Sequence, residues 1–321
     1  MIISIIIAVK IWQKNLEECV NKCLELDYKD FEIIILPDAP IEQGRFSART
    51  VPVVAIPTGA VGPGEKRDIG TKHAKGEIVA FIDDDVYPVR DWLKNAVRSF
   101  SDPEVAAVGG PAVTPLEDGF WQRASGAVFS SVLVSGQYVY RYLPTKQREI
   151  DDYPSCNLLV RKSVMEKIGG FNTDFWPGED TKLCLDIKNL GMKIIYDPDA
   201  LVYHHRRKLF GPHLKQVASY ALHRGYFVKR YPGNSLKLAY FLPSFFVLGL
   251  LLGVVFSPLL SPIAVLYSYA LFSYLILVLI FSIQKDLRLT LPVFAGIILT
   301  HLAYGIYFLK GLLTTKLKEE K

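Results

Sequence analysis

Three consecutive aspartates, Asp83, Asp84 and Asp85, directly follow the apolar run Ile78–Ile82. Like charges this close destabilise one another unless a cation lies among them. Carboxylate oxygens suit hard divalent cations, and Mg²⁺ usually takes one or two carboxylates together with the phosphate oxygens of a substrate. The triplet therefore predicts a divalent-cation site for a phosphate-bearing ligand such as a nucleotide. The alternative is an acidic loop at a strand end that is simply solvated.

Alternating apolar runs and amphipathic segments surround this triplet. Such a βαβα order predicts a mainly parallel sheet covered by helices on both faces. In such sheets ligands bind beyond the carboxyl ends of the strands, so Asp38, which follows the second strand, is expected on the same rim as the triplet. The opening stretch is expected to be a buried strand, not a signal peptide, since no basic residue precedes it. The predicted strands cover 1–9, 31–36, 77–82 and 105–113, and the predicted helices cover 15–26, 64–74 and 90–100.

The charge of the chain is unevenly distributed. Residues 1–199 carry 23 Lys/Arg and 29 Asp/Glu, whereas residues 200–321 carry 14 and 3. From Leu238 to Gln284 no residue is charged, a run long enough for two membrane-spanning helices. We therefore predict a membrane region at 238–313 with about three helices. The alternative, three buried helices of a soluble domain, fits poorly with runs of this length. The predicted helices cover 238–256, 262–283 and 289–309.

Basic residues predict the orientation of this region. Eight Lys/Arg lie between residues 203 and 237, just before the first predicted span. The positive-inside rule therefore predicts a multi-pass membrane protein whose residues 1–205 are cytoplasmic. The C-terminal lysines conflict with three spans, because three crossings would export Lys310, Lys316, Lys318 and Lys321. Either the tail is tolerated outside or one segment does not cross.

With these motifs in order, the sequence resembles glycosyltransferase family 2, the inverting nucleotide-sugar enzymes with the GT-A fold. The resemblance covers roughly residues 2–230. It rests on "SIIIAV" at the start, on "GPGEKRDIGTKHAKGEIVAFIDDD" with its arginine helix and DxD strand, and on the segment from "SCNLLVRK" to "DALVYHH" with its Gly-Gly-Phe turn and Glu-Asp pair. The stretch "LKQVASYALHRGYFVKR" is similar to membrane-anchored members that build exopolysaccharides or lipid-linked glycans.

The resemblance implies a donor site for a nucleotide-sugar and a metal, Mg²⁺ or Mn²⁺. The implied metal ligands are Asp83, Asp85 and His204; for His204 the alternative is an interfacial histidine beside lipid headgroups. The sequence departs from the family pattern at Asp68. Family members usually have Asn at this position, directly after the arginine that corresponds to Arg67. The implied donor contacts are Asp38, Arg67, Asp83, Asp84 and Glu179.

The resemblance also implies an acceptor site. Asp180 is the expected general base, because direct displacement at the sugar requires a group that deprotonates the acceptor hydroxyl. Its alternative is a plain acidic residue at a helix N-terminus. Trp176 and Asn157 are the expected acceptor contacts. The acceptor is expected to be a glycan or lipid-linked hydroxyl; a polyprenyl phosphate, or less favourably a nucleotidyltransferase reaction, is the alternative.

The predicted organisation has three parts: a GT-A domain at 1–205, a basic amphipathic segment at 206–237 and the membrane region at 238–313. Residues 210–230 alternate aromatic and basic side chains, as in helices that lie against anionic lipid headgroups. A nucleic-acid partner is not expected beside a membrane span. Residues 117–150 leave three alternatives open: an acceptor groove, a membrane-lying segment or a mobile insertion. Nothing in the sequence points to an oligomeric state.

Overall fold

The computed structural model describes residues 1–41 and 51–320 and forms two compact units. The first unit comprises residues 1–113, 143–205 and 319–321, and the second comprises 114–142 and 206–318. The sequence predicted 1–205 as one domain. The structure corrects this, because residues 114–142 leave the first unit and pack with the C-terminal helices.

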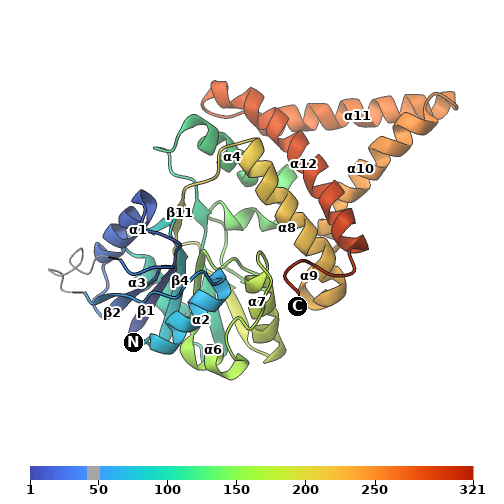
Figure 1. Ribbon diagram of the computed structural model, residues 1–321. Helices are drawn as coiled ribbons and strands as arrows, with labels where there is room; N and C mark the ends of the chain where they lie inside the picture. The colour runs from blue at the N-terminus through green and yellow to red at the C-terminus, as the bar shows by residue number, and fades with distance from the viewer. Residues whose placement is uncertain (42–50, 321) are drawn as a thin grey trace. The chain divides into compact units, whose positions relative to one another are not determined.

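An eight-stranded sheet forms the centre of the first unit (Figure 1). Its strand order is β3-β2-β1-β4-β9-β6-β10-β8. The pairs β1–β2, β1–β4, β2–β3 and β6–β10 are parallel, whereas β9 runs antiparallel between β4 and β6, and β8 is an antiparallel edge. The predicted mainly parallel sheet is therefore confirmed. The strands are β1 Ile3–Ala8, β2 Phe31–Leu36, β3 Val53–Ala55, β4 Ile78–Asp83, β6 Val105–Gly109, β8 Arg148–Ile150, β9 Asn157–Arg161 and β10 Lys193–Tyr196.

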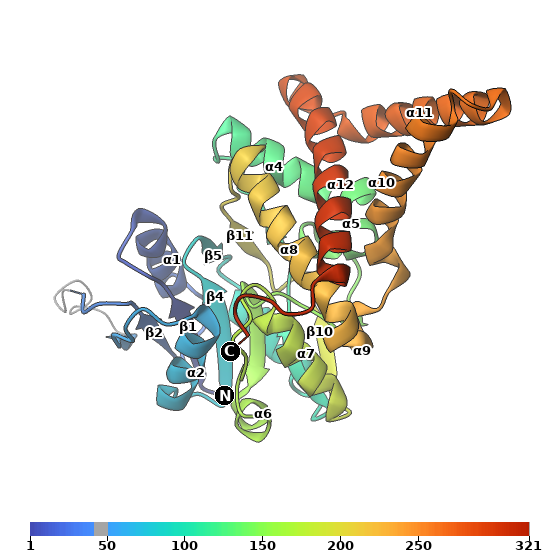
Figure 2. The same cartoon turned by 45° about the vertical axis from the view of Figure 1, so that its right-hand side comes forward.

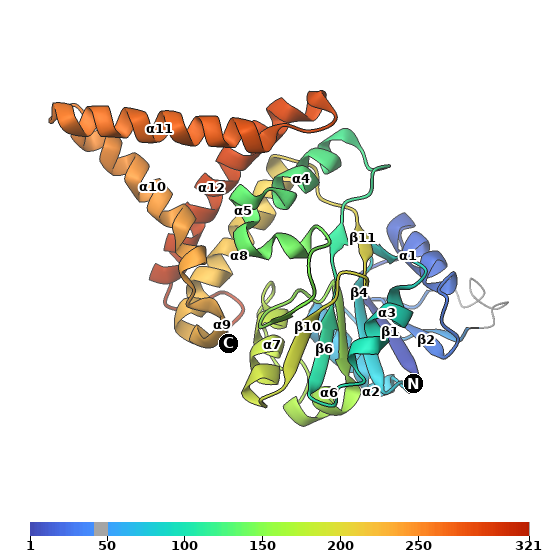
Figure 3. The same ribbon diagram turned by 180° about the vertical axis from the view of Figure 1, so that it is seen from behind.

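Helices cover both faces of this sheet, as Figures 1 and 3 show from opposite sides. Helices α1 and α3 bury their apolar sides against the face that carries Ile5 and Ile7. Helix α2 lies on the opposite face, where Gly70 approaches Ile6 so closely that a Cβ would lie 2.8 Å from its Cγ2. Glycine at this position thus sets how near α2 lies to the strands. The helices of this unit are α1 Lys14–Leu24, α2 Pro63–His73, α3 Trp92–Ser99, α6 Lys162–Ile168 and α7 Glu179–Asn189.

A smaller sheet of order β5-β11-β7 carries part of the rim. Its strands are β5 Val86–Pro88, β7 Ala112–Val113 and β11 Val202–His204. The predicted single strand over 105–113 is wrong, because it divides at Gly110-Pro111 into β6 of the large sheet and β7 of the small one. Gly110 lies against the chain at Ala200, where a Cβ would be 1.8 Å from the carbonyl oxygen.

The second unit is helical (Figure 2). Three of its segments are long and apolar enough to cross a membrane: Leu238–Phe256, Ser261–Ser282 and Leu287–Leu313. They agree closely with the three predicted helices. Its helices are α4 Phe120–Ser130, α5 Val132–Ser135, η2 Gly136–Arg141, α8 Gly211–Arg230, α9 Pro232–Ser235, α10 Leu238–Phe256, α11 Ser261–Ser282, η3 Leu287–Leu289 and α12 Thr290–Leu313.

Candidate active site

The carboxyl ends of three neighbouring strands lie level with one another. In the sheet register Ala8 of β1 is opposite both Leu36 of β2 and Asp83 of β4. Asp38 lies two residues beyond β2, and Asp84 begins the turn after β4. The predicted shared rim of acidic residues is therefore present.

A buried lysine of α2 ties two of these strand ends together. Lys66 is 3% exposed, and its Nζ donates to the carbonyl oxygens of Val9 (2.6 Å) and Leu36 (3.2 Å). The same ammonium pairs with the Asp38 carboxylate. A buried ammonium requires several acceptors, and here they fix the position of Asp38. The sequence analysis missed Lys66; its place in the first turn of a helix that faces two strand ends is the signal that identifies it.

Arg67, the next residue, joins the β4 rim to the start of α7. Its Nη2 donates to Asp83 Oδ1 (2.7 Å) and its Nη1 to Glu179 Oε1 (2.9 Å), while the guanidinium lies 5.6 Å from the Phe171 ring centre. Burial disfavours the charge of Arg67, but Asp83 and Glu179 outweigh burial and hold its pKa above its usual range. The side chain is 4% exposed. In this arrangement the two terminal nitrogens of the Arg67 guanidinium bind carboxylates, not a phosphate.

Asp68 explains how the chain tolerates a departure from the family pattern. Its Oδ1 accepts from the backbone N–H of Phe171 (2.9 Å) in the Gly169-Gly170-Phe171 turn. An asparagine carbonyl oxygen can accept the same bond, so the two residue types are interchangeable for this contact.

Asp84 titrates abnormally within the triplet. Burial raises the pKa of Asp84 to about 6, and the charges of Asp85 and Asp83 add to this, while a hydrogen bond from the Gln13 amide opposes it. Negative charge at the end of β4 is thus not fully compensated by protein groups. This is the electrostatic setting that a divalent cation stabilises.

Asp85 and His204 lie beside each other, although 119 positions separate them in the sequence. The pairing of β11 with β5 sets His204 opposite Val86, so His204 Nε2 lies 3.4 Å from Asp85 Oδ1. Within the described residues, no three His, Cys, Asp or Glu side chains are grouped to enclose a metal. A carboxylate and an imidazole on a rim still fit a cation that takes its remaining ligands from substrate phosphates and water.

The first turn of α7 supplies the candidate base. Glu179 is 5% exposed and is held by Arg67, whereas Asp180 is half-buried and its Oδ1 accepts from Thr181 N–H (2.8 Å). The partial positive charge at a helix N-terminus favours carboxylates here. Because Arg67 links Glu179 to Asp83, the candidate base and the acidic rim belong to one site.

The two expected acceptor residues lie in different environments. Trp176 is 54% exposed and lies three residues before Glu179, the first residue of α7. Asn157 is completely buried; its Oδ1 accepts from Trp92 Nε1 (2.8 Å) and its Nδ2 donates to the carbonyl oxygens of Gly110 (2.6 Å) and Ala200 (2.8 Å). The expectation that Asn157 contacts an acceptor is therefore corrected: its side chain joins β9 to α3 and to the β6–β7 junction.

A model of the family described as "Glycosyl transferase family 2" matches residues 4–169, more than half of the chain. The chain belongs to glycosyl transferase family 2. The match includes Lys66, Arg67 and the aspartate triplet, and it ends at the Gly-Gly-Phe turn.

Two curated relatives differ in how much of the chain they match. A pre-mycofactocin glycosyltransferase of Mycobacterium tuberculosis is 31% identical over 177 residues, which is 55% of this chain but only 37% of that protein. A protein of Methanococcus voltae named dolichyl N-acetyl-alpha-D-glucosaminyl phosphate 3-beta-D-2,3-diacetamido-2,3-dideoxy-beta-D-glucuronosyltransferase is 23% identical over 97% of both chains.

A solved structure confirms the GT-A fold. The mannosyltransferase PcManGT from Pyrobaculum calidifontis, solved in complex with GDP-Man and Mn²⁺, superposes with a TM-score of 0.66 at 18% identity. The superposition covers 98% of this chain and 88% of that one. The likeness thus extends to the architecture of both units.

Proposed function

We propose that this family 2 chain transfers a sugar, with inversion, from a nucleotide-sugar to a hydroxyl of a glycan or lipid-linked acceptor. The observation that carries the proposal is the Arg67 bridge. It connects Asp83 at the metal rim with Glu179 at the start of α7, so that donor phosphates and an acceptor near Asp180 meet in one place.

Each rim residue then has a defined task. Asp38, held by Lys66, faces the nucleoside, and Asp83 and Asp84 line the ribose and diphosphate. Asp85 and His204 would hold Mg²⁺ or Mn²⁺, which when bound stabilises negative charge on the departing nucleotide. The structurally similar mannosyltransferase solved with GDP-Man and Mn²⁺ supports this choice of donor and metal.

Asp180 accepts the proton of the acceptor hydroxyl while that oxygen attacks the anomeric carbon. A carboxylate beside the reacting group is suited to this task. The exposed indole of Trp176, four residues earlier, offers a flat face on which an acceptor sugar ring packs.

The acceptor is proposed to arrive at the cytoplasmic face of a membrane. Three apolar helices in the second unit support membrane anchoring, and the basic segment before them supports a cytoplasmic catalytic unit in contact with anionic headgroups. The Methanococcus relative, whose name specifies a dolichyl-phosphate-linked sugar, matches almost the full chain and supports a lipid-linked acceptor.

Nucleotide release by the purified full chain in detergent tests the proposal. With a panel of nucleotide-sugars and a lipid-linked glycan acceptor, we expect release from one donor, loss of release in EDTA and recovery on adding Mn²⁺ or Mg²⁺. Asp85→Asn should abolish release while leaving the melting temperature unchanged, and Asp91→Asn, at an exposed site on the same unit, is the matched control. Full activity in EDTA or in Asp85→Asn contradicts the metal assignment.

A further inference from the structure

Helices α8 and α12 lie side by side and point in the same direction (Figures 1 and 2). At one end His213 Nε2 lies 3.0 Å from Thr300 Oγ1. At the other end Lys229 Nζ donates to the Thr314 carbonyl oxygen (2.6 Å). The contact therefore extends over nearly the whole of α8.

Glycines bring the two helix backbones together between these ends. A Cβ at Gly225 would lie 2.2 Å from the carbonyl oxygen of Phe308. A Cβ at Gly311 would lie 2.1 Å from the carbonyl oxygen of Leu222. No lipid chain fits between helices in this contact, so α8 and α12 must occupy the same depth in any membrane.

The first half of α12 is covered by other parts of the second unit. Gly296 lies against the side chains of Val128 and Leu209. Just before η3, Asp286 is 3.4 Å from Arg123 of α4. Both halves of α12 thus contact segments that carry basic residues.

The depth of these neighbours disfavours a crossing by α12. Thr300 is the midpoint of the candidate span Leu287–Leu313, so a crossing would set Thr300 and its partner His213 at the bilayer centre. Lys215 is exposed and lies only about 3 Å further along α8. The headgroups would be about 15 Å away, which a lysine side chain does not reach, and lysine at the bilayer centre is strongly disfavoured.

Helices α10 and α11 also contact α12, α10 in its first half, where Ser244 Oγ donates to the Gly305 carbonyl oxygen (3.0 Å), and α11 in its last half, where Tyr274 Oη lies 2.9 Å from His301 Nδ1. Their remaining residues, up to the connection at 257–260, extend beyond this contact. Both helices are more apolar along their length than Leu287–Leu313. Only 6% of the apolar stretch of α11 is buried, against 33% of that in Leu287–Leu313, so α11 presents apolar side chains in nearly every direction. Residues 257–260, which join α10 to α11, carry no charge.

We infer that α10 and α11 cross the bilayer as a hairpin, whereas α12 does not cross and lies with α8 on one side of the membrane. This inference rests on the membrane anchoring proposed above. It removes the conflict in the sequence, because Lys310, Lys316 and Lys318 then share a side with the basic residues of 206–237.

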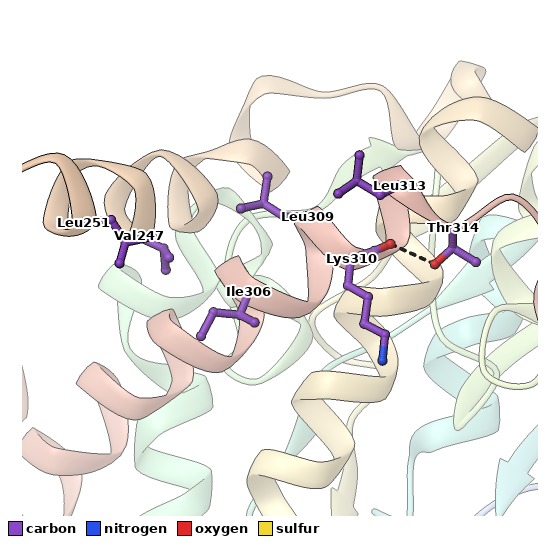
Figure 4. A pocket seen from close by; sticks show the side chains of 7 residues that line it. All are labelled: Val247, Leu251, Ile306, Leu309, Lys310, Leu313 and Thr314. Carbon is purple, nitrogen blue, oxygen red and sulfur yellow. Dashed lines mark hydrogen bonds between the residues drawn. The ribbon is translucent and has the colours of Figure 1, made fainter.

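The C-terminal end of α12 has the character of a headgroup-level surface. A pocket of about 500 Å³ opens between α10 and α12 (Figure 4). Its lining is apolar except at one end, where Lys310 points away from Val247 and Leu251. The apolar side chains suit a lipid chain, and Lys310 suits the phosphate of its headgroup. This combination is expected where the end of α12 lies beside lipid headgroups.

Cysteine labelling in intact cells tests the inference. Single cysteines replace the exposed residues Ser101, Ser261 and Thr315 in the full chain; the four native cysteines are all buried. We expect Ser261→Cys to react with a membrane-impermeant maleimide in intact cells, and Ser101→Cys and Thr315→Cys to react only after permeabilisation. Retained transfer activity in each variant verifies its fold.

Two results overturn the inference. Reaction of Thr315→Cys together with Ser261→Cys in intact cells means that α12 crosses, and equal reaction at all three positions means that the hairpin does not. A third result separates the inference from the proposed function. If Ser101→Cys and Thr315→Cys react in intact cells and Ser261→Cys does not, the proposed cytoplasmic orientation is wrong, but α12 still does not cross.

Discussion

At the scale of single residues, the site depends on pairs of residues that are adjacent in the sequence but have different side-chain partners. Lys66 and Arg67 point to different acids, the first to Asp38 and the second to Asp83 and Glu179. In the same way Arg67 holds Glu179, whereas the next residue, Asp180, which accepts from the Thr181 N–H, is the proposed general base. Consecutive residues on a helix start point in different directions, so one short segment serves two purposes.

Replacing Asp180 distinguishes the two acceptor classes. A hydroxyl acceptor needs a general base, which typically contributes about 10²- to 10⁴-fold in rate, whereas a polyprenyl phosphate is already anionic. We therefore expect Asp180→Asn to lower kcat by about that factor with donor affinity little changed. Steady-state kinetics and donor-binding calorimetry measure the two quantities. The exposed Asp174→Asn is the matched control, and near-full transfer by Asp180→Asn favours the phosphate acceptor.

Trp176 and Asn157 should respond oppositely to truncation. Trp176→Ala removes an exposed ring, so we expect a higher KM for the acceptor and no change in melting temperature. Asn157→Ala leaves the buried N–H of Trp92 and the carbonyl oxygen of Ala200 without the Asn157 side chain, while the Gly110 carbonyl oxygen keeps its bond from the Tyr153 hydroxyl. Each unsatisfied group costs about 1–3 kcal/mol. We expect a loss of roughly 3 kcal/mol or more in unfolding free energy, and an unchanged unfolding midpoint would contradict the buried role.

At the scale of elements, the sequence predicts what local patterns determine. Strands β1, β2 and β4 each have five apolar residues out of six, and all three are found where they were predicted. The antiparallel insertion of β9 and the division of β6 from β7 depend on contacts made by distant residues, such as Gly110 with Ala200. The position of Lys66 depends likewise on where β1 and β2 end in space. Local sequence carries no signal of such long-range pairings.

The packing of α8 predicts a pH dependence of stability. Burial lowers the pKa of His213 to about 4, assisted by the charge of Arg206, against about 6.5 for an exposed histidine. Between these values the unfolded chain binds a proton that the folded chain excludes, so the unfolding free energy falls as pH decreases from 6.5 to 4.

The expected loss from this one group is about 3 kcal/mol. Thermal unfolding in detergent between pH 7 and pH 4.5 measures it. His213→Gln should lower the melting temperature at pH 7 but weaken its pH dependence, while His73→Gln, on the exposed side of α2, should change neither. If the pH dependence of the melting temperature were the same in His213→Gln as in the unchanged protein, His213 would not be its cause.

At the scale of the whole molecule, the proposed active site and the three apolar helices lie in two different units whose segments alternate along the chain. Residues 114–142 leave the catalytic unit and return to it, so the helical unit is built from two separate stretches. The strong charge asymmetry of the sequence follows this division. Loss of residues 114–142 is therefore expected to disturb α12, because α4 and α8 together cover its length.

The three oxygens around Lys66 have a consequence for reagent chemistry. Its amine is shielded by Val9, Leu36 and Asp38, whereas an electrophile needs an accessible, unprotonated nitrogen. Lysine methylation followed by peptide mass spectrometry should then modify exposed amines such as Lys72 long before Lys66. The rate of methylation at Lys66 then reports how often the ends of β1 and β2 separate transiently. A bound nucleotide should lower that rate.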